Sequence, residues 1–84
     1  ISDIQALDVN FYPNPCYGDI TLTWEGGDDV ADVVAFDQLG KKVGVFLNVR
    51  KGQRINLNVS SGMYILNIRS DNHTGSVTVD VLSE

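Results

Sequence analysis

Apolar and polar residues alternate along most of this chain, and that alternation limits the fold more than any other feature. It places one side chain in a core and the next in water, as in an antiparallel β-strand that is solvated on one face. Five segments alternate in this way, with apolar positions at Leu7, Val9, Phe11; Ile20, Leu22, Trp24; Val43, Val45, Leu47; Ile55, Leu57, Val59; and Val77, Val79, Val81. We expect the apolar side chains of each segment to face a common core.

Two further segments are apolar on both faces. Residues 31–36 carry a single charge, at Asp32, and residues 63–69 place Tyr64, Leu66 and Ile68 on the face expected to be better buried. Strands covered on both faces read as near-continuous apolar runs. We therefore predict that 31–36 is a central strand and that 63–69 is similar to it.

Turn-forming residues separate these segments at intervals of about ten residues. They lie at 13–15, 17–19, 26–29, 39–41, 51–53, 61–62 and 71–75. About seven short strands at this spacing predict an all-β fold, an immunoglobulin-like antiparallel β-sandwich. We assign residues 7–84 to this single domain and residues 1–6 to a linker or strand lead-in.

Charge and composition exclude several classes of function. The net charge of −5 and the pI of about 4.5 argue against nucleic-acid binding, which needs clustered Lys and Arg. The basic residues at 41–42 and 50–54 are expected to be solvated loop ends. The apolar stretches are too short to cross a bilayer, so no membrane insertion is expected. No secretory signal follows Ile1, and we expect an excised fragment or a processed product.

The sequence offers little to a catalytic mechanism, which needs a nucleophile with a base, a carboxylate pair in a cleft, or a metal. His73, the only histidine, falls in a predicted solvent-exposed turn. Cys16, the only cysteine, has no histidine near it in sequence to activate its thiol, and no partner for a disulfide. We therefore predict no enzyme, no catalytic residue and no cofactor.

An acidic loop is the one candidate for a metal site. Glu25, Asp28 and Asp29, with Asp32 beyond them, carry oxygen ligands of the kind that calcium prefers. The loop lacks the alternating Asp-x-Asp spacing of an organised calcium loop. We expect a solvated hairpin tip and no metal.

The order of the turn motifs is more specific than any of them alone. A Tyr-Pro-Asn-Pro turn and a glycine follow the first strand, an Asp-x-x-Gly-Lys turn follows 31–36, and a Gly-x-Tyr-x-Leu segment opens the strand at 63–69. The motif residues are Tyr12, Pro13, Asn14, Pro15, Gly18, Asp37, Gly40, Lys41, Gly62, Tyr64 and Leu66. In this order, over about residues 7–82, the chain resembles the C-terminal sorting domain of the type IX (Por) secretion system of Bacteroidota.

Each motif also has a physical role. Pro13 and Pro15 fix φ and remove two backbone donors, so the chain must leave its sheet there. Gly40 and Gly62 suit positions that need φ > 0 before a strand resumes. Tyr64 alternates in phase with the apolar positions after it, so we expect its ring to pack inward while its hydroxyl reaches an edge. These residues are predicted to form the fold first, and recognition is what the resemblance adds.

The resemblance implies a secretion signal. In that family the domain ends a cargo protein that has reached the periplasm, an outer-membrane translocon recognises it, and the cargo passes to the cell surface or the medium. A surface sortase-like protease then commonly removes the domain, here with a cut expected around residues 1–6. Family members often finish with a basic, strand-like tail, whereas residues 78–84 carry Asp80 and Glu84 and no Lys or Arg.

The implied partners are therefore the upstream cargo domain, the translocon and the sortase-like protease, and edge strands predict a weak homodimer in concentrated solution. Two other functions stay open. The first is an immunoglobulin-like structural spacer in a secreted multidomain protein. The second is a carbohydrate-binding module that stacks sugars on exposed aromatic rings, although packing in the core or on the sheet is the stronger expectation for them. The aromatic candidates are Trp24, Tyr12, Tyr17 and Tyr64.

Overall fold

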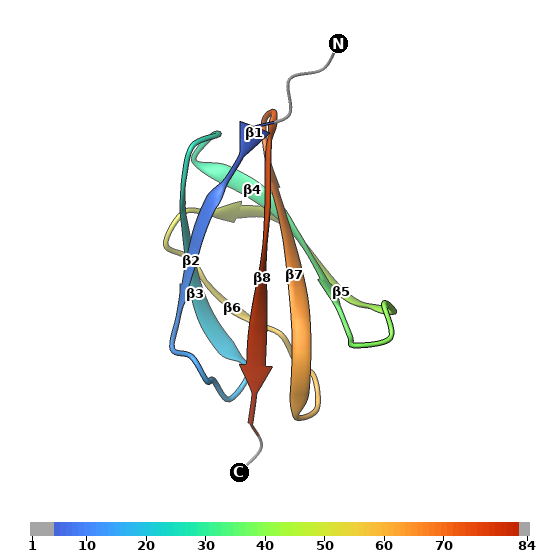
Figure 1. The fold of residues 1–84 in the computed structure, drawn as a ribbon. Coiled ribbons are helices and arrows are strands. Elements are labelled where there is room, and N and C mark those ends of the chain that lie inside the picture. The colour runs from blue at the N-terminus through green and yellow to red at the C-terminus, as the bar shows by residue number, and fades with distance from the viewer. Residues whose placement is uncertain (1–4, 83–84) are drawn as a thin grey trace.

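The computed structural model describes residues 5–82, which form eight β-strands joined by loops (Figure 1). The strands are β1 (Gln5–Ala6), β2 (Asp8–Tyr12), β3 (Asp19–Glu25), β4 (Val30–Phe36), β5 (Lys42–Arg50), β6 (Arg54–Asn56), β7 (Gly62–Ser70) and β8 (His73–Val81). Residues 1–4 of the linker or strand lead-in predicted at 1–6, and the chain end at 83–84, lie outside the described residues. The boundary proposed between linker and domain stays a prediction.

The strands form two sheets that face each other, so the predicted all-β sandwich is confirmed. The larger sheet has the order β1-β8-β7-β4-β5 and the smaller one β2-β3-β6. All neighbouring strands are antiparallel except β1 and β8, which run parallel. The strand in addition to the seven predicted is β1. Its two residues add to the edge of the larger sheet before the chain crosses to the smaller one (Figure 1).

The core lies between the two sheets. β3 supplies Ile20, Leu22 and Trp24, each at most 1% exposed, and the prediction for this strand is confirmed. β4 lies between β5 and β7, as predicted for 31–36, and its inner side chains pack against those of β7. The Trp24 indole N–H donates to the Asp28 carbonyl at 2.8 Å, which satisfies the one polar group of a buried ring.

The prediction for β5 is confirmed at Val43, which packs against the core, and is wrong in its phase beyond it. Val45 and Leu47 are 49% and 67% exposed, because they lie on the outer face of the larger sheet rather than in the core. Val49, two residues further along, is 2% exposed. The alternation reverses between them because Asn48, with φ of 56°, is an extra residue in the β4–β5 register. Such a β-bulge turns every following side chain to the other face.

Two shorter predictions are also corrected. The segment expected to run through Leu57 and Val59 forms a strand only at Arg54–Asn56, since Asn58 adopts a φ of 52° that a strand does not accommodate. The acidic residues 26–29 do not form a hairpin tip. They connect β3 of the smaller sheet to β4 of the larger one.

That connection is tied to β7 by one buried side chain. The Ser70 hydroxyl, in a residue that is 1% exposed, accepts from the Asp28 N–H and donates to the Val30 carbonyl, both at 2.7 Å. A Cβ at Gly27, where φ is 63°, would lie 2.8 Å from Ser70. The acidic loop is therefore solvated, as predicted, but it is a connection between the sheets that Ser70 holds in place.

The path of the chain from β1 to β2 depends on a close approach of the Leu7 backbone to Gly75. Leu7, where the chain changes sheets, donates its N–H to the Thr74 carbonyl at 2.9 Å. A Cβ on Gly75 would lie 2.7 Å from the Leu7 carbonyl oxygen and 3.0 Å from Val9. The backbone can cross the edge of β8 here only because Gly75 has no side chain.

We predict that Gly75→Ala lowers the free energy of unfolding by about 1–3 kcal/mol, the usual cost of forcing an extra methyl group into a packed contact. Chemical denaturation of the chain measures it. The matched control is Gly44→Ala in β5, where the added Cβ would meet the movable Phe46 ring at 3.3 Å rather than a backbone atom. Equal losses in the two variants would contradict the close approach at Gly75.

Candidate recognition surface

Most of the predicted motifs lie toward one end of the sandwich. Successive long strands run in opposite directions, so the loops that follow β2 and β6 lie at the end where β8 finishes, while the turn after β4 projects to the side, beside β5 (Figure 1). We call these loops together the motif end, formed by residues 13–18, 37–41 and 57–61 with Val81 and Leu82. The opposite end, with residues 26–29, 51–53 and 71–72, is where β1 lies. Tyr12, Gly62 and Tyr64 directly adjoin the motif end, whereas Leu66 lies in the interior with 0% exposure.

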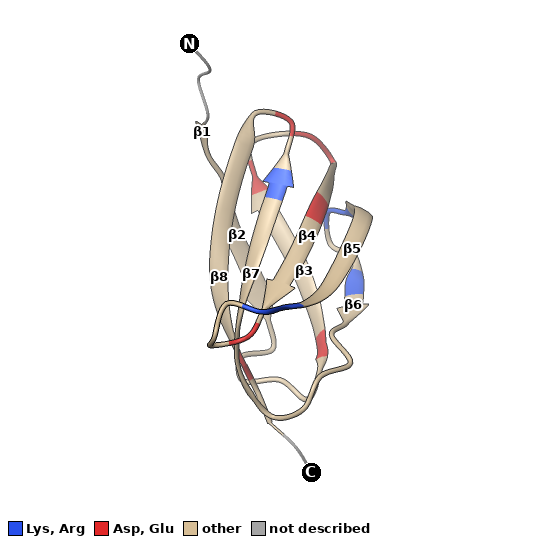
Figure 2. Cartoon of the chain, turned by 90° about the vertical axis from the view of Figure 1, so that its right-hand side faces the viewer, with Lys and Arg blue, Asp and Glu red and all other residues tan. Residues whose placement is uncertain are grey.

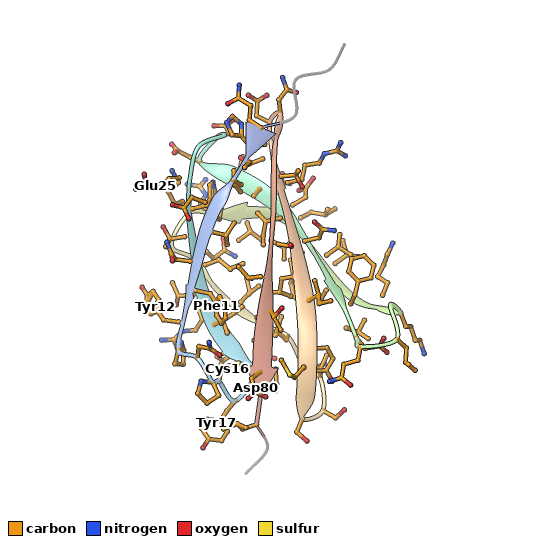
Figure 3. The ribbon with its side chains drawn as sticks, in the orientation of Figure 1. Phe11, Tyr12, Cys16, Tyr17, Glu25 and Asp80 are labelled. Atoms are coloured by element: carbon orange, nitrogen blue, oxygen red, sulfur yellow. The ribbon has the colours of Figure 1, made fainter. Side chains whose placement is uncertain are left out.

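The 13–18 loop fastens the end of β8. The prolines end β2 at Tyr12, as predicted, and Cys16 then lies beside β8 (Figure 3). The Cys16 N–H donates to the Asp80 carbonyl at 3.0 Å, and its carbonyl accepts from the Leu82 N–H at 2.7 Å. Cys16 itself is 0% exposed, so its thiol is buried in the core.

The same loop also reaches the connection between β6 and β7. Gly18, with φ of 109°, accepts a hydrogen bond at its carbonyl from the Leu57 N–H at 2.8 Å. The left-handed φ at this position explains the motif glycine, since other residues rarely adopt it. The 13–18 loop thus connects β8, the smaller sheet and the 57–61 segment at one point.

The Asp37 turn is organised by its own carboxylate. Asp37 Oδ1 accepts from the N–H groups of Leu39 and Lys41, both at 2.9 Å. Gly40 completes the turn with φ of 84°, the conformation predicted for it. As a result Leu39 projects at the tip with 93% exposure, and the Lys41 side chain is exposed beside it.

Tyr64 is placed as predicted. Its ring is buried, with 7% of the residue exposed, and its hydroxyl donates to the Ser60 carbonyl at 2.7 Å. A tyrosine that bonds back to the backbone a few residues upstream is a hallmark of immunoglobulin-like sandwiches. Gly62, with φ of 151°, lies against the ring, where an added Cβ would be 3.7 Å from it.

The motif residues therefore divide into two groups. Gly18, Asp37, Gly62, Tyr64 and Leu66 shape the fold and are buried or half-buried. The exposed group forms a surface at the motif end and consists of Tyr12, Pro13, Asn14, Pro15, Gly40 and Lys41.

Sequence reasoning did not place three further exposed residues on this surface. Tyr17 is 64% exposed, Leu39 93% and Leu82 38%. Leu39 lies inside the Asp-x-x-Gly-Lys motif and Tyr17 directly follows the buried Cys16, so adjacency to the motifs was the available signal. Figure 3 shows Tyr12 and Tyr17 pointing outward from the two sides of the 13–18 loop.

Cys16 and His73, the two side chains considered for a catalytic role, are far apart. His73 begins β8 and Cys16 bridges to Val81 at its end, and a nine-residue strand separates such positions by roughly 26 Å. Within residues 5–82, no three His, Cys, Asp or Glu side chains are grouped so as to hold a metal ion. The same residues contain no helix long and apolar enough to cross a membrane.

Comparison with known protein families agrees with this arrangement. A family model for the secretion system C-terminal sorting domain matches residues 10–81 of the 84-residue chain, a range that contains all the motifs above. The chain belongs to the family of type IX secretion C-terminal sorting domains. Membership implies a cargo attached upstream and export through the type IX system toward the cell surface or the extracellular space. The chain matches none of the curated proteins.

We predict that Tyr64→Phe lowers the free energy of unfolding by about 1 kcal/mol, because it removes one buried hydrogen bond while keeping the ring. Chemical denaturation measures the change. Tyr17→Phe is the matched control, since that tyrosine is 64% exposed. A Tyr64→Phe variant as stable as the Tyr17→Phe variant would show that the bond to Ser60 does not hold the 57–61 segment.

Proposed function

We propose that the domain is recognised in the periplasm by the outer-membrane translocon of the type IX system through the exposed surface at the motif end. The observation that carries the proposal is the division of the motif residues into a buried group that shapes the fold and an exposed group. The buried motif residues fix three loops and the end of β8, and they thereby hold the exposed ones in defined positions, Tyr12 to Pro15 at the 13–18 loop and Lys41 in the turn before β5. A receptor that reads a folded signal needs such a fixed set of side chains.

The position of β1 supports the same proposal. β1 lies at the end of the sandwich opposite to the motif end (Figure 1). A cargo attached upstream therefore leaves the domain on the far side from the exposed motif residues. This geometry places the attachment point of the cargo away from the 13–18 loop.

We further propose that the domain catalyses no reaction and is the substrate of a sortase-like protease on the cell surface of a Bacteroidota host. The separation of Cys16 and His73 along β8 supports the first part. The predicted cut around residues 1–6 lies largely in the part of the chain that the structure does not describe. The weak homodimer stays a prediction, for which sedimentation at increasing concentration is the measurement.

A carbohydrate-binding function has less support. Of its four candidate rings, Trp24 and Tyr64 are buried at 1% and 7% exposure. Tyr12 and Tyr17 are exposed, but they flank the 13–18 loop and point to different sides (Figure 3). A structural spacer stays an alternative that the transport experiment below separates from a sorting signal.

The test is a transport assay. Residues 1–84 are fused to the end of a periplasm-directed fluorescent reporter and expressed in a host with a working type IX system and in its translocon-deficient mutant. We expect reporter outside the cell in the first strain only. Folded, intact reporter trapped in the periplasm of both strains would contradict a sorting function and leave a structural spacer.

A matched pair of variants maps the surface. Asn14→Ala changes an exposed motif residue, and Asn72→Ala makes the same change in the exposed turn at the opposite end. We expect Asn14→Ala to reduce export by about tenfold, the effect of losing one or two well-placed contacts, with unchanged thermal stability. Equal export of both variants would place recognition away from the 13–18 loop.

A further inference from the structure

The open edge of β5 is a second candidate interaction surface, which begins beside the 37–41 turn and lies apart from the 13–18 loop. Within residues 5–82, β5 pairs with β4 on one side and with no strand on the other. A strand at the edge of a sheet presents unpaired N–H and C=O groups that can bind another extended chain. Figure 2 views the molecule from the side on which β5 lies in Figure 1.

The positive charge of this acidic domain is concentrated around that edge. Four of the six basic residues lie on β5 or in its flanking turns, and Arg54 on β6 and Arg69 on β7 are the exceptions. The four are Lys41, Lys42, Arg50 and Lys51. Cations therefore stand at both ends of β5 while the whole chain carries a net charge of −5.

Most of these cations are free to bind an anion. In the part of the chain that the structure describes, the one ion pair joins Lys51 to Asp29, at 3.9 Å. The two carboxylates closest to β5 in the sheet are engaged with backbone N–H groups. Asp37 accepts from its own turn, and Asp32 Oδ1 accepts from the Asn48 N–H at 3.1 Å. Lys42 and Arg50 have no carboxylate partner within residues 5–82.

The side chains between the two basic ends are apolar. Val45 and Leu47, at 49% and 67% exposure, project from the outer face of β5. They lie in the regular stretch between the bulge at Asn48 and the register shift that precedes Gly44. An added strand could therefore pair with 44–47 and place alternate apolar side chains beside Val45 and Leu47.

Positive charge on an edge strand can prevent pairing with a second copy, and it can also attract an acidic segment. The sign of the charge on the partner strand distinguishes these two roles. Edge lysines commonly prevent a strand from pairing with copies of its own protein. In an antiparallel pairing of two β5 strands, Lys42 would face Arg50 of the copy, and that repulsion opposes a dimer through this edge. This repulsion is specific to β5, because the rest of a second copy is acidic and the cations do not repel it. The charge at this edge therefore opposes pairing with another β5 and favours binding of an acidic chain.

We propose that the open edge of β5 is a docking site for an extended acidic polypeptide segment, with acidic residues at both ends and apolar side chains between them. The segment adds to the larger sheet beside 44–47. Its acidic ends lie near Lys42 and Arg50. This interaction goes beyond the sorting function and uses none of the exposed residues at positions 12–15.

The test is a titration of the isotope-labelled 84-residue chain with a blocked nine-residue peptide that has two Asp at each end and alternating Thr and Val between them. We expect saturable shifts of the backbone amides at 43–48 and slower hydrogen exchange there. Binding weakens as salt rises from about 20 to about 500 mM, because exposed charges are screened. Two control peptides have Lys in place of Asp, or N-methyl groups on alternate amides, and neither should bind.

Two single substitutions test the basic ends of β5, and a third is their matched control. Lys42→Glu and Arg50→Glu each reverse one exposed charge at the edge, and we expect each to weaken binding about three- to tenfold at low salt. Arg54→Glu reverses an equally exposed charge on the smaller sheet and should leave binding unchanged.

Four results would overturn the proposal. They are no saturable binding up to about 1 mM peptide, equal binding of either control peptide, shifts confined to β6 or to the motif end, and a concentration-dependent dimer that occupies β5 without peptide. The transport assay does not depend on this titration, so the failure of either leaves the other standing.

Discussion

The edge of β8 holds the two sheets together. At its start, β1 pairs with it in parallel through Gln5 and Ala6, and at its end Cys16 bridges to Val81. The first contact brings the chain from the larger sheet into β2, and the second returns it to the larger sheet from the loop after β2. Without these two contacts, the three-stranded sheet would be joined to the larger one mainly by side-chain packing and by the loops between strands.

This constraint explains why a sorting motif lies where it does. The Tyr-Pro-Asn-Pro loop has to leave the smaller sheet abruptly and then bring Cys16 beside β8, and two prolines followed by Gly18 meet that requirement. The exposed side chains of the same loop are consequently fixed relative to the end of β8. In this domain a residue can be a motif residue for its effect on the backbone, as Gly18 is, or for its exposure, as Asn14 is.

Much of the architecture was predictable from the sequence because its signals are local. Alternation on β3 and β7, the proline exit after Tyr12, the Asp37 turn and the inward Tyr64 ring all depend on residues close together in the chain. The predictions that were wrong concern features set by pairing between segments that are distant in the sequence. Nothing near Asn48 indicates that Asp32 accepts its N–H and that a bulge reverses the phase of β5.

The candidate surface was predictable to the same degree. The motifs identified its residues, but their convergence at one end follows from the strand order, which no short motif encodes. The acidic loop shows the opposite case. Its composition correctly indicated a solvated segment, but not that Ser70, forty or more residues away, would hold its conformation through hydrogen bonds to Asp28 and Val30.

The parallel pairing of β1 with β8 has a mechanical consequence. β1 lies at one end of the sandwich and β8 finishes at the other (Figure 1). A pull between an upstream cargo and a grip on the end of β8 would slide the two strands along each other, so their hydrogen bonds are loaded together. Resistance to such a pull depends on the rate of forced unfolding rather than on equilibrium stability. The contacts at Gln5 and Ala6 therefore lie where such a pull would load them in shear.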